Sequence, residues 1–166
     1  MKETGPCGRR PTIGVMGAGS CAPDVSDLAY DVGRLVAQSG AILLCGGLGG
    51  VMEAAARGAR DSGGLVVGVL PGRDARETPP NPYVDVAIFT GMSDGRNWIN
   101  ACSSDAVIAI AGGYGTLSEI ALAMKIGRPV VVVGSWELSA SGVGEQPLIA
   151  TTAAEAVAAA LRGIRT

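Results

Sequence analysis

The sequence AVIAIAGGYGTLSE, at residues 106–119, is the strongest indication of how this chain folds. Five uninterrupted apolar residues, 106–110, are typical of a strand that is buried on both faces. Three glycines follow, and after them apolar residues recur at helical spacing. Glycine lets the backbone turn tightly, and the first turn of a helix presents unpaired N–H groups and the positive end of the helix dipole. The stretch therefore predicts a strand, a turn and a helix N-terminus that form an anion site, most simply for a phosphate.

The rest of the chain repeats this alternation of apolar runs and helical patterns. Strands are expected at 12–16, 41–45, 65–70, 84–89, 106–110 and 130–133, with a further edge strand at 147–150. Helices are expected at 25–36, 51–60, 92–103, 116–126 and 152–161. This order predicts a single doubly wound, Rossmann-like α/β domain, residues 1–166, with a mostly parallel six- or seven-stranded sheet and helices on both faces. We expect residues 1–10 to be a loose tail and 71–82 to be the longest loop.

Composition limits the class of protein. Hydrophobic residues make up 48% of the chain and charged residues 17%, with a mean hydropathy of +0.34. We therefore expect a partner copy to cover part of the surface, in a homo-oligomer that is a dimer or a tetramer. No apolar run approaches the roughly 20 residues that a membrane span needs, and the N-terminus does not resemble a signal peptide. These features favour a cytoplasmic protein with no membrane partner.

Charge, cysteine and histidine content exclude several kinds of chemistry. A net charge of −2 without a block of like charges argues against a nucleic-acid partner. The four cysteines stand far apart, which is typical of reduced thiols in a cytoplasm. Histidine is absent from the sequence, which excludes Ser-His and Cys-His nucleophile pairs and His-based metal sites. We expect no metal and no required cofactor, and any acid–base chemistry would fall to carboxylates.

Two more glycine-rich segments follow expected strands: GAGSCA at 17–22 and GGLGG at 46–50. The first fits the loose dinucleotide pattern, but the second strand ends without the carboxylate that an NAD site uses for the ribose, and there is no Gly-Lys-Ser/Thr of a P-loop. Each loop alone could be a tight turn, yet all three belong at the carboxyl edge of one parallel sheet, where ligands bind. The candidate ligand-binding residues in these loops are Gly17, Gly19, Ser20, Gly46, Gly47, Gly49, Gly50, Gly112, Gly113, Gly115 and Thr116.

Combined with residues elsewhere in the chain, these motifs resemble the Lonely-Guy superfamily. The resemblance rests on the segment 46–52, the glycines of 64–68, Met92 with Arg96, and the segment 112–116 with Glu119, and it extends from about residue 13 to residue 133. Members of the superfamily were long labelled "possible lysine decarboxylase", and many are cytokinin-activating phosphoribohydrolases. The resemblance implies a Rossmann-like fold, a nucleotide-type ligand that contacts Met92 and Arg96, and Arg96 and Glu119 as catalytic residues.

A finer resemblance is to a subgroup of short Rossmann-like proteins that includes the molybdenum cofactor carrier proteins. Gly-Val-Met-Glu and an Arg-Asn pair are usual there, and this chain has Gly50-Val51-Met52-Glu53 and Arg96-Asn97. The hydrolase pattern has proline where this chain has Ala111, and lysine where it has Asn97. The second departure removes a cation that would help to hold a substrate phosphate, and it makes Asn97 a candidate ligand contact.

Several candidate residues also have simpler interpretations. Arg96 could bind phosphate oxygens with its guanidinium fork or pair with Asp94 or Asp105. Glu119 could stabilise the positive charge that develops on a ribose during N-glycosidic cleavage, or it could complete a Thr-x-x-Glu capping box with Thr116. Ser20 could donate to a phosphate or cap the next helix, although Asp24 is a better candidate for that cap.

Three functions remain open from the sequence. The first is a carrier or sensor that binds a phosphorylated nucleotide-like or pterin-like molecule, with a nucleoside monophosphate or molybdenum cofactor as the ligand. The second is a hydrolase that cleaves the N-glycosidic bond of a nucleoside 5′-monophosphate through Arg96 and Glu119. The third is a purely structural role with empty loops. Lysine decarboxylase chemistry is excluded, because it uses a Schiff-base lysine and only Lys2 and Lys125 are present, in an expected tail and at an expected helix end.

Overall fold

A computed structural model describes residues 8–134, 144 and 146–164. The described strands form one seven-stranded sheet in the order β4-β3-β2-β1-β5-β6-β7, and every strand pairing is parallel. The strands are β1 (Thr12–Gly17), β2 (Ile42–Cys45), β3 (Val66–Leu70), β4 (Val86–Phe89), β5 (Ala106–Ile110), β6 (Val130–Val133) and β7 (Leu148–Ala150). The predicted parallel α/β fold is confirmed, with the larger of the two expected strand numbers.

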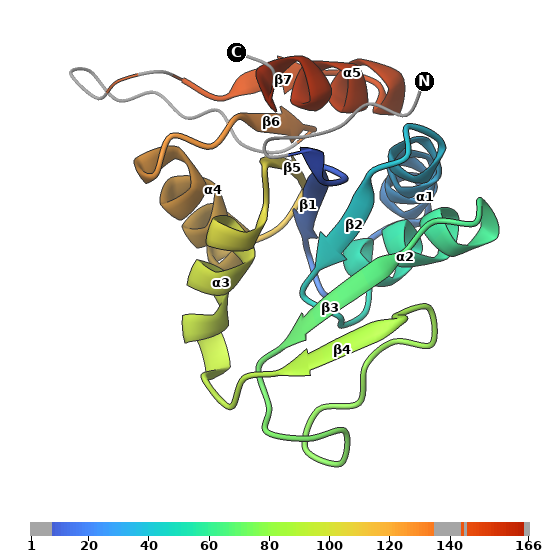
Figure 1. Ribbon diagram of the computed structural model, residues 1–166, viewed down its shortest axis with the longest axis vertical. Coiled ribbons are helices and arrows are strands. Elements are labelled where there is room, and N and C mark those ends of the chain that lie inside the picture. The colour runs from blue at the N-terminus through green and yellow to red at the C-terminus, as the bar shows by residue number, and fades with distance from the viewer. Residues whose placement is uncertain (1–7, 135–143, 145, 165–166) are drawn as a thin grey trace.

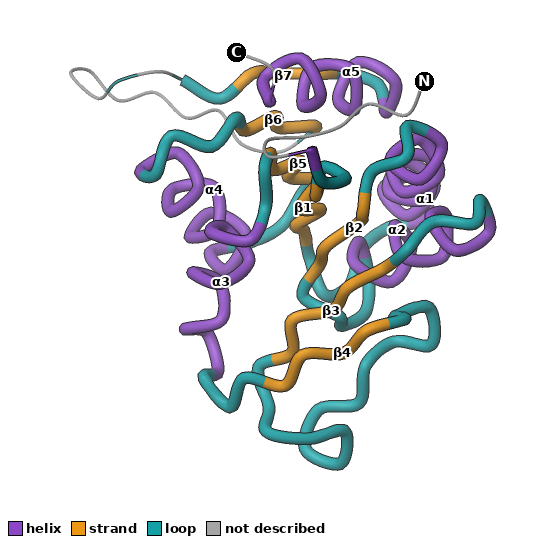
Figure 2. Tube along the Cα trace, in the orientation of Figure 1, coloured by secondary structure: helices purple, strands orange, loops and turns teal. Residues whose placement is uncertain are grey.

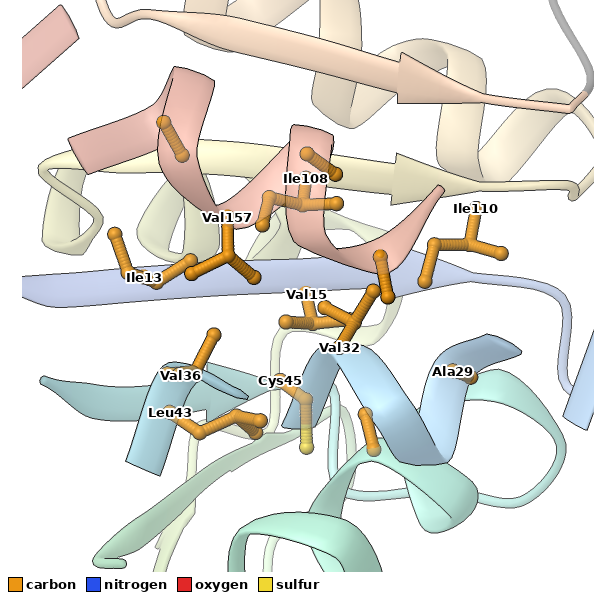
Figure 3. Close-up of a cluster of buried hydrophobic side chains, with 14 of the residues drawn as sticks. Ile13, Val15, Ala29, Val32, Val36, Leu43, Cys45, Ile108, Ile110 and Val157 are labelled. Atoms are coloured by element: carbon orange, nitrogen blue, oxygen red, sulfur yellow. The ribbon is translucent and has the colours of Figure 1, made fainter. Parts of the chain in front are cut away.

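Helices cover both faces of the sheet. α1 (Pro23–Gln38), α2 (Val51–Asp61) and α5 (Ala153–Ile164) lie on one face, and α3 (Arg96–Ser103) and α4 (Tyr114–Lys125) lie on the other (Figures 1 and 2). Strand side chains alternate between two buried clusters, so that Ile13 and Val15 of β1 pack with the first group of helices and Met16 packs with the second. Figure 3 shows the first cluster, in which α1 and α5 cover the central strands. Burial on both faces explains the nearly continuous apolar runs of β1, β2, β3, β5 and β6, whereas the apolar edge strands β4 and β7 are partly exposed.

The strand order reverses between β1 and β5. The chain continues from β1 to β2 on one side of this pair and from β5 to β6 on the other. Connections that diverge in this way leave a crevice beyond the carboxyl ends of the two strands, and ligands of open α/β sheets bind there. The loops after β1 and β5 therefore flank the switch point, and the loop after β2 lies beside them.

The five expected helices are present, but most of their boundaries differ by one to three residues from those expected, and one of the helices is interrupted. In place of the predicted helix 92–103 the structure has a 3₁₀ turn, η2 (Ser93–Gly95), followed by α3, and the positive φ of 50° at Ser93 prevents an α-helix from beginning at residue 92. α4 begins at Tyr114, two residues before the expected start. Arg9 and Arg10 of the expected loose tail also contact the body of the protein: Arg9 pairs with Asp105 at 2.7 Å, and Arg10 donates to the carbonyl of Gly40 at 2.7 Å.

Candidate functional site

The loops after β1 and β2 pack directly against each other. The backbone N–H of Val51 donates to the carbonyl of Ala18 at 3.0 Å. Gly50 has a φ of 61°, and a Cβ at this position would overlap the same carbonyl. The long loop between β3 and β4 also contributes, since Asn81 donates from its backbone to Gly47 and from its side chain to Leu48, both at 2.9 Å. Sequence reasoning missed Asn81, because nothing in a Pro-rich loop indicates which distant backbone it binds.

Eight of the nine candidate glycines fall into two groups, while a Cβ at the ninth, Gly49, would lie 3.0 Å from the carbonyl oxygen of Gly19. Gly17, Gly46, Gly47, Gly50 and Gly112 are required inside the protein, because a Cβ would overlap neighbouring atoms or the backbone has positive φ. Gly19, Gly113 and Gly115 have neither constraint, and a Cβ at any of the three would meet no atom within 4 Å. Gly115 even lies inside α4, where glycine is about 1 kcal/mol less favourable than alanine. The fold does not need these three glycines, so bare backbone for a ligand is the simplest reason for them.

Helix ends converge on the same edge. α1, α2 and α4 follow β1, β2 and β5, and none of the three has a side-chain hydrogen bond at its N-cap. α5 does: Thr152 Oγ1 accepts from the N–H of Glu155, and Glu155 Oε2 accepts from the N–H of Thr152, both at 3.2 Å. The described residues therefore contain a capping box at α5, away from the switch point. At the switch point, the N-caps of α1, α2 and α4 have no side-chain acceptor.

Two expected caps are wrong. α1 begins after Ala22 without a side-chain cap, so neither Ser20 nor Asp24 fills that role. Asp24 lies in the first turn of α1, and Ser20 is exposed in the loop after β1.

Arg96, the first residue of α3, is buried under the loop that follows β2. Its side chain fills the space that a Cβ at Gly46 would occupy, and its Nη1 atom is enclosed without a hydrogen-bond partner. The expected alternative, an ion pair with Asp105, is wrong: Asp105 accepts hydrogen bonds from Nη1 and Nη2 of Arg9 and from the N–H of Thr12. Within the described residues Arg96 forms no ion pair, neither with Asp94 nor with any other carboxylate.

Glu119 lies beside Arg96 on the neighbouring helix and is only 7% exposed. Its Oε1 accepts a hydrogen bond from Asn100 Nδ2 at 2.7 Å. Burial raises the pKa of Glu119 above its ordinary value, although the Asn100 hydrogen bond and the Arg96 charge both act in the opposite direction. The expected capping box with Thr116 is wrong, because the N-cap of α4 is Gly113 and Thr116 lies inside the helix against Gly112.

Asn97 joins the first turns of α3 and α4. Its Nδ2 donates to Ser118 Oγ at 2.9 Å, and Ser118 Oγ in turn donates to the carbonyl of Gly115 at 2.6 Å. Because the hydroxyl proton of Ser118 is used in this way, Ser118 Oγ can only accept from Asn97, which turns Asn97 Oδ1 away from α4. Met92 is 51% exposed, immediately before η2. The structure thus brings Arg96, Asn97 and Glu119 to the N-termini of two adjacent helices.

Other features of the described residues lie outside this edge. They contain no group of three His, Cys, Asp or Glu side chains placed to hold a metal ion. None of the described helices has the length and apolarity needed to cross a membrane. A hollow of about 490 Å³ lies over β7 and α5, lined by Leu148, Ile149 and Arg162 among others, and it includes none of the candidate residues.

Comparison with known proteins agrees with this geometry. Residues 10–160 match the model of the SLOG cluster4 family. The chain belongs to the SLOG cluster4 family. Among the solved structures, this SLOG cluster4 protein is similar to the molybdenum cofactor binding protein of Rippkaea orientalis, with 38% identity, a TM-score of 0.83 and coverage of 95% of this chain and 99% of the other. It is similar to the molybdenum cofactor carrier protein of Chlamydomonas reinhardtii, with 34% identity, a TM-score of 0.80 and coverage of 95% and 100%.

The SLOG cluster4 chain also resembles hydrolases. It is 36% identical, over 121 residues, to the cytokinin riboside 5′-monophosphate phosphoribohydrolase of Mycobacterium tuberculosis. That match covers 68% of this chain and 64% of the hydrolase, so the chain spans somewhat less than two thirds of that relative. Both resemblances seen in the sequence, to Lonely-Guy hydrolases and to molybdenum cofactor carriers, are confirmed.

Proposed function

We propose that this protein binds a phosphorylated nucleotide-like or pterin-like small molecule at the carboxyl edge of its sheet. The observation that carries the proposal is Arg96, a 91% buried cation that lies beside Glu119 but forms no ion pair with the described residues, and whose enclosed Nη1 has no hydrogen-bond partner. A buried charge is costly unless a counter-ion compensates for it. A phosphate held by the guanidinium fork and the adjacent helix N-termini would supply that charge.

Two further features support this proposal. Gly19, Gly113 and Gly115 leave open backbone around the switch point, which permits a close approach by a ligand. The similar proteins from Rippkaea orientalis and Chlamydomonas reinhardtii are a molybdenum cofactor binding protein and a molybdenum cofactor carrier protein. AMP and molybdenum cofactor are therefore the first ligands to test.

Isothermal titration calorimetry with AMP, molybdenum cofactor and inorganic phosphate tests the proposal. The Arg96→Met variant should lose most of the affinity, while Arg34→Met, which removes a half-exposed arginine on α1, should bind as the wild type does. Absence of binding by the wild type at millimolar concentrations of all three ligands would refute the proposal.

Cleavage of a nucleoside 5′-monophosphate to base and ribose 5-phosphate is the second candidate. The neighbouring Arg96 and Glu119 and the similarity to the phosphoribohydrolase of Mycobacterium tuberculosis favour it. In this reaction Arg96 would orient the substrate phosphate, and Glu119 would stabilise the charge on the ribose. The test is chromatographic detection of free adenine from AMP. Turnover that survives Glu119→Gln unchanged would exclude this mechanism.

We also propose that copies of the chain form a homo-oligomer. Seven large apolar side chains are exposed among the described residues: Val86, Ile88, Met92, Trp98, Tyr114, Leu148 and Ile149. Val86 and Ile88 lie on one edge strand, β4, and Leu148 and Ile149 lie on the other, β7, and an exposed apolar sheet edge is a surface that another copy can cover. Light scattering coupled to size-exclusion chromatography would measure the mass, and a monomer at micromolar concentration would contradict the proposal.

A further inference from the structure

The inner face of α3 carries a row of polar side chains beneath the sheet. Arg96, Asn100 and Ser104 follow one another at a spacing of four residues, the last at the C-cap of the helix. The strands make room for the ends of this row, because a Cβ at Gly46 would overlap Arg96 and a Cβ at Gly14 would overlap Ser104. Between these two lies Asn100, which is fully buried. Polar side chains in such a position are retained for a reason other than core packing.

The hydrogen bonds fix the orientation of the Asn100 amide. Nδ2 donates to Glu119 Oε1 at 2.7 Å, and an ionised carboxylate can only accept, so the amide nitrogen must face Glu119. Oδ1 is then enclosed without a hydrogen-bond partner among the described residues. An apolar side chain of the same size would avoid the cost of burying this oxygen. The buried Oδ1 of Asn100 therefore lowers the stability of the fold, while Nδ2 of the same side chain holds Glu119.

The two oxygens of Glu119 are in different situations. Oε1 is tied to Asn100, whereas Oε2 accepts no hydrogen bond from the described residues and is not among the enclosed unpartnered atoms. Arg96 is the cation that faces the carboxylate from α3, and the thiol of Cys45 faces it from the end of β2. Burial raises the pKa of Cys45 to about 11, so this thiol is neutral near pH 7 and adds no charge.

From this arrangement we propose that Asn100 is a positioning residue that holds Oε1 of Glu119, so that Oε2 is the oxygen offered to the ligand. The proposal rests on the proposed function, since it needs a ligand at this edge. It deepens that function by naming the ligand chemistry: a phosphorylated molecule that also carries a hydroxyl or N–H donor within reach of Oε2. Methyl phosphate in its doubly ionised form carries no O–H or N–H group and should not need Asn100.

A carboxyl titration tests the positioning without any ligand. In protein labelled with ¹³C at the glutamate side-chain carboxyl, the Glu119 signal is the one that Glu119→Gln removes. Asn100→Leu keeps the volume and removes the donor, and it should move the titration midpoint upward by about one pH unit. Ser104→Ala, which removes a hydrogen bond to the Asn100 carbonyl on the same row, should leave the midpoint unchanged. If Asn100→Leu does not fold, Asn100→Ala also removes the donor, and a midpoint equal to that of the wild type in the folded variant overturns the proposal.

Calorimetry separates this proposal from the proposed function. At pH 7 the AMP affinity of Asn100→Leu should fall about tenfold or more while the affinity for methyl phosphate stays within twofold, as expected for loss of one charge-assisted hydrogen bond. An equal loss for both ligands overturns the assignment of Oε2 to a donor of the ligand. A shifted titration midpoint in a protein whose wild type binds none of AMP, molybdenum cofactor and inorganic phosphate supports the positioning of Glu119 and refutes the proposed function.

Discussion

Replacement of Gly115 by alanine should stabilise the protein and weaken its ligand binding. Gly115 lies in the first turn of α4, its φ is not positive, and a Cβ would meet no atom within 4 Å. Alanine is favoured over glycine in a helix by up to about 1 kcal/mol, and for a domain of this size that gain corresponds to an increase in Tm of roughly 2–4 °C. If the open space belongs to the ligand, the methyl group should instead reduce the affinity for AMP by about tenfold or more.

A matched variant makes this experiment decisive. Gly33 also lies inside a helix, α1, but a Cβ there would overlap the backbone of Ala55 in α2. Gly33→Ala should therefore lower the free energy of unfolding by about 1–3 kcal/mol, despite the same gain in helix propensity. Urea denaturation measures both variants, and calorimetry with AMP measures binding. A Gly115→Ala protein that is more stable and binds AMP as tightly as the wild type would refute the assignment of this glycine to the ligand.

Three further predictions concern charged residues. Arg96→Lys keeps the charge but loses the guanidinium fork, so AMP affinity in calorimetry should fall by about 1.5–3 kcal/mol, and wild-type affinity would contradict a bidentate contact. Burial raises the pKa of Glu119, so its neutral form is favoured in the folded state, and stability is lost as pH rises from the unfolded pKa through the folded pKa. Glu119→Gln should remove this loss. In urea denaturation, the midpoint of the variant should therefore lie above that of the wild type at pH 8 and closer to it at pH 4. Asp105→Ala should lower the free energy of unfolding by about 2–4 kcal/mol, because it leaves the N–H of Thr12 without its acceptor. Arg9→Ala removes the half-exposed partner of the Arg9–Asp105 ion pair and should lower the free energy of unfolding by less than about 1 kcal/mol.

The fold could be predicted from the sequence because its signals are local. Each buried strand is an apolar run, and each of the loops after β1, β2 and β5 is marked by glycine. The parallel sheet then places these loops at one edge without any knowledge of side-chain contacts. Arg96 could be expected at that edge for a different reason, because it is one of the residues that carry the resemblance to the Lonely-Guy superfamily.

The partners of the site residues could not be predicted, because they depend on packing between elements. Asn100 and Glu119 are nineteen residues apart, and they meet only because α3 and α4 lie side by side on one face. The Thr-x-x-Glu pattern at Thr116 failed as a capping box because α4 begins at Tyr114, which leaves Thr116 one turn too far inside the helix. The pattern that does cap a helix, at Thr152 and Glu155, has the same spacing and no sequence feature that distinguishes it.

The pairing of β1 with β5 has a consequence for the kinetics of folding. β1 ends at Gly17 and β5 begins at Ala106, so the two strands at the centre of the sheet can pair only after a long segment of chain has been looped out. Gly17, Gly46 and Arg96 lie with the half of the sheet that contains β1 to β4, and Gly115 lies with the half that begins at β5. A molecule bound across this seam would have to dissociate before the halves could separate. Ligand should then slow unfolding far more than it speeds refolding, so occupancy would determine how long each folded molecule lasts.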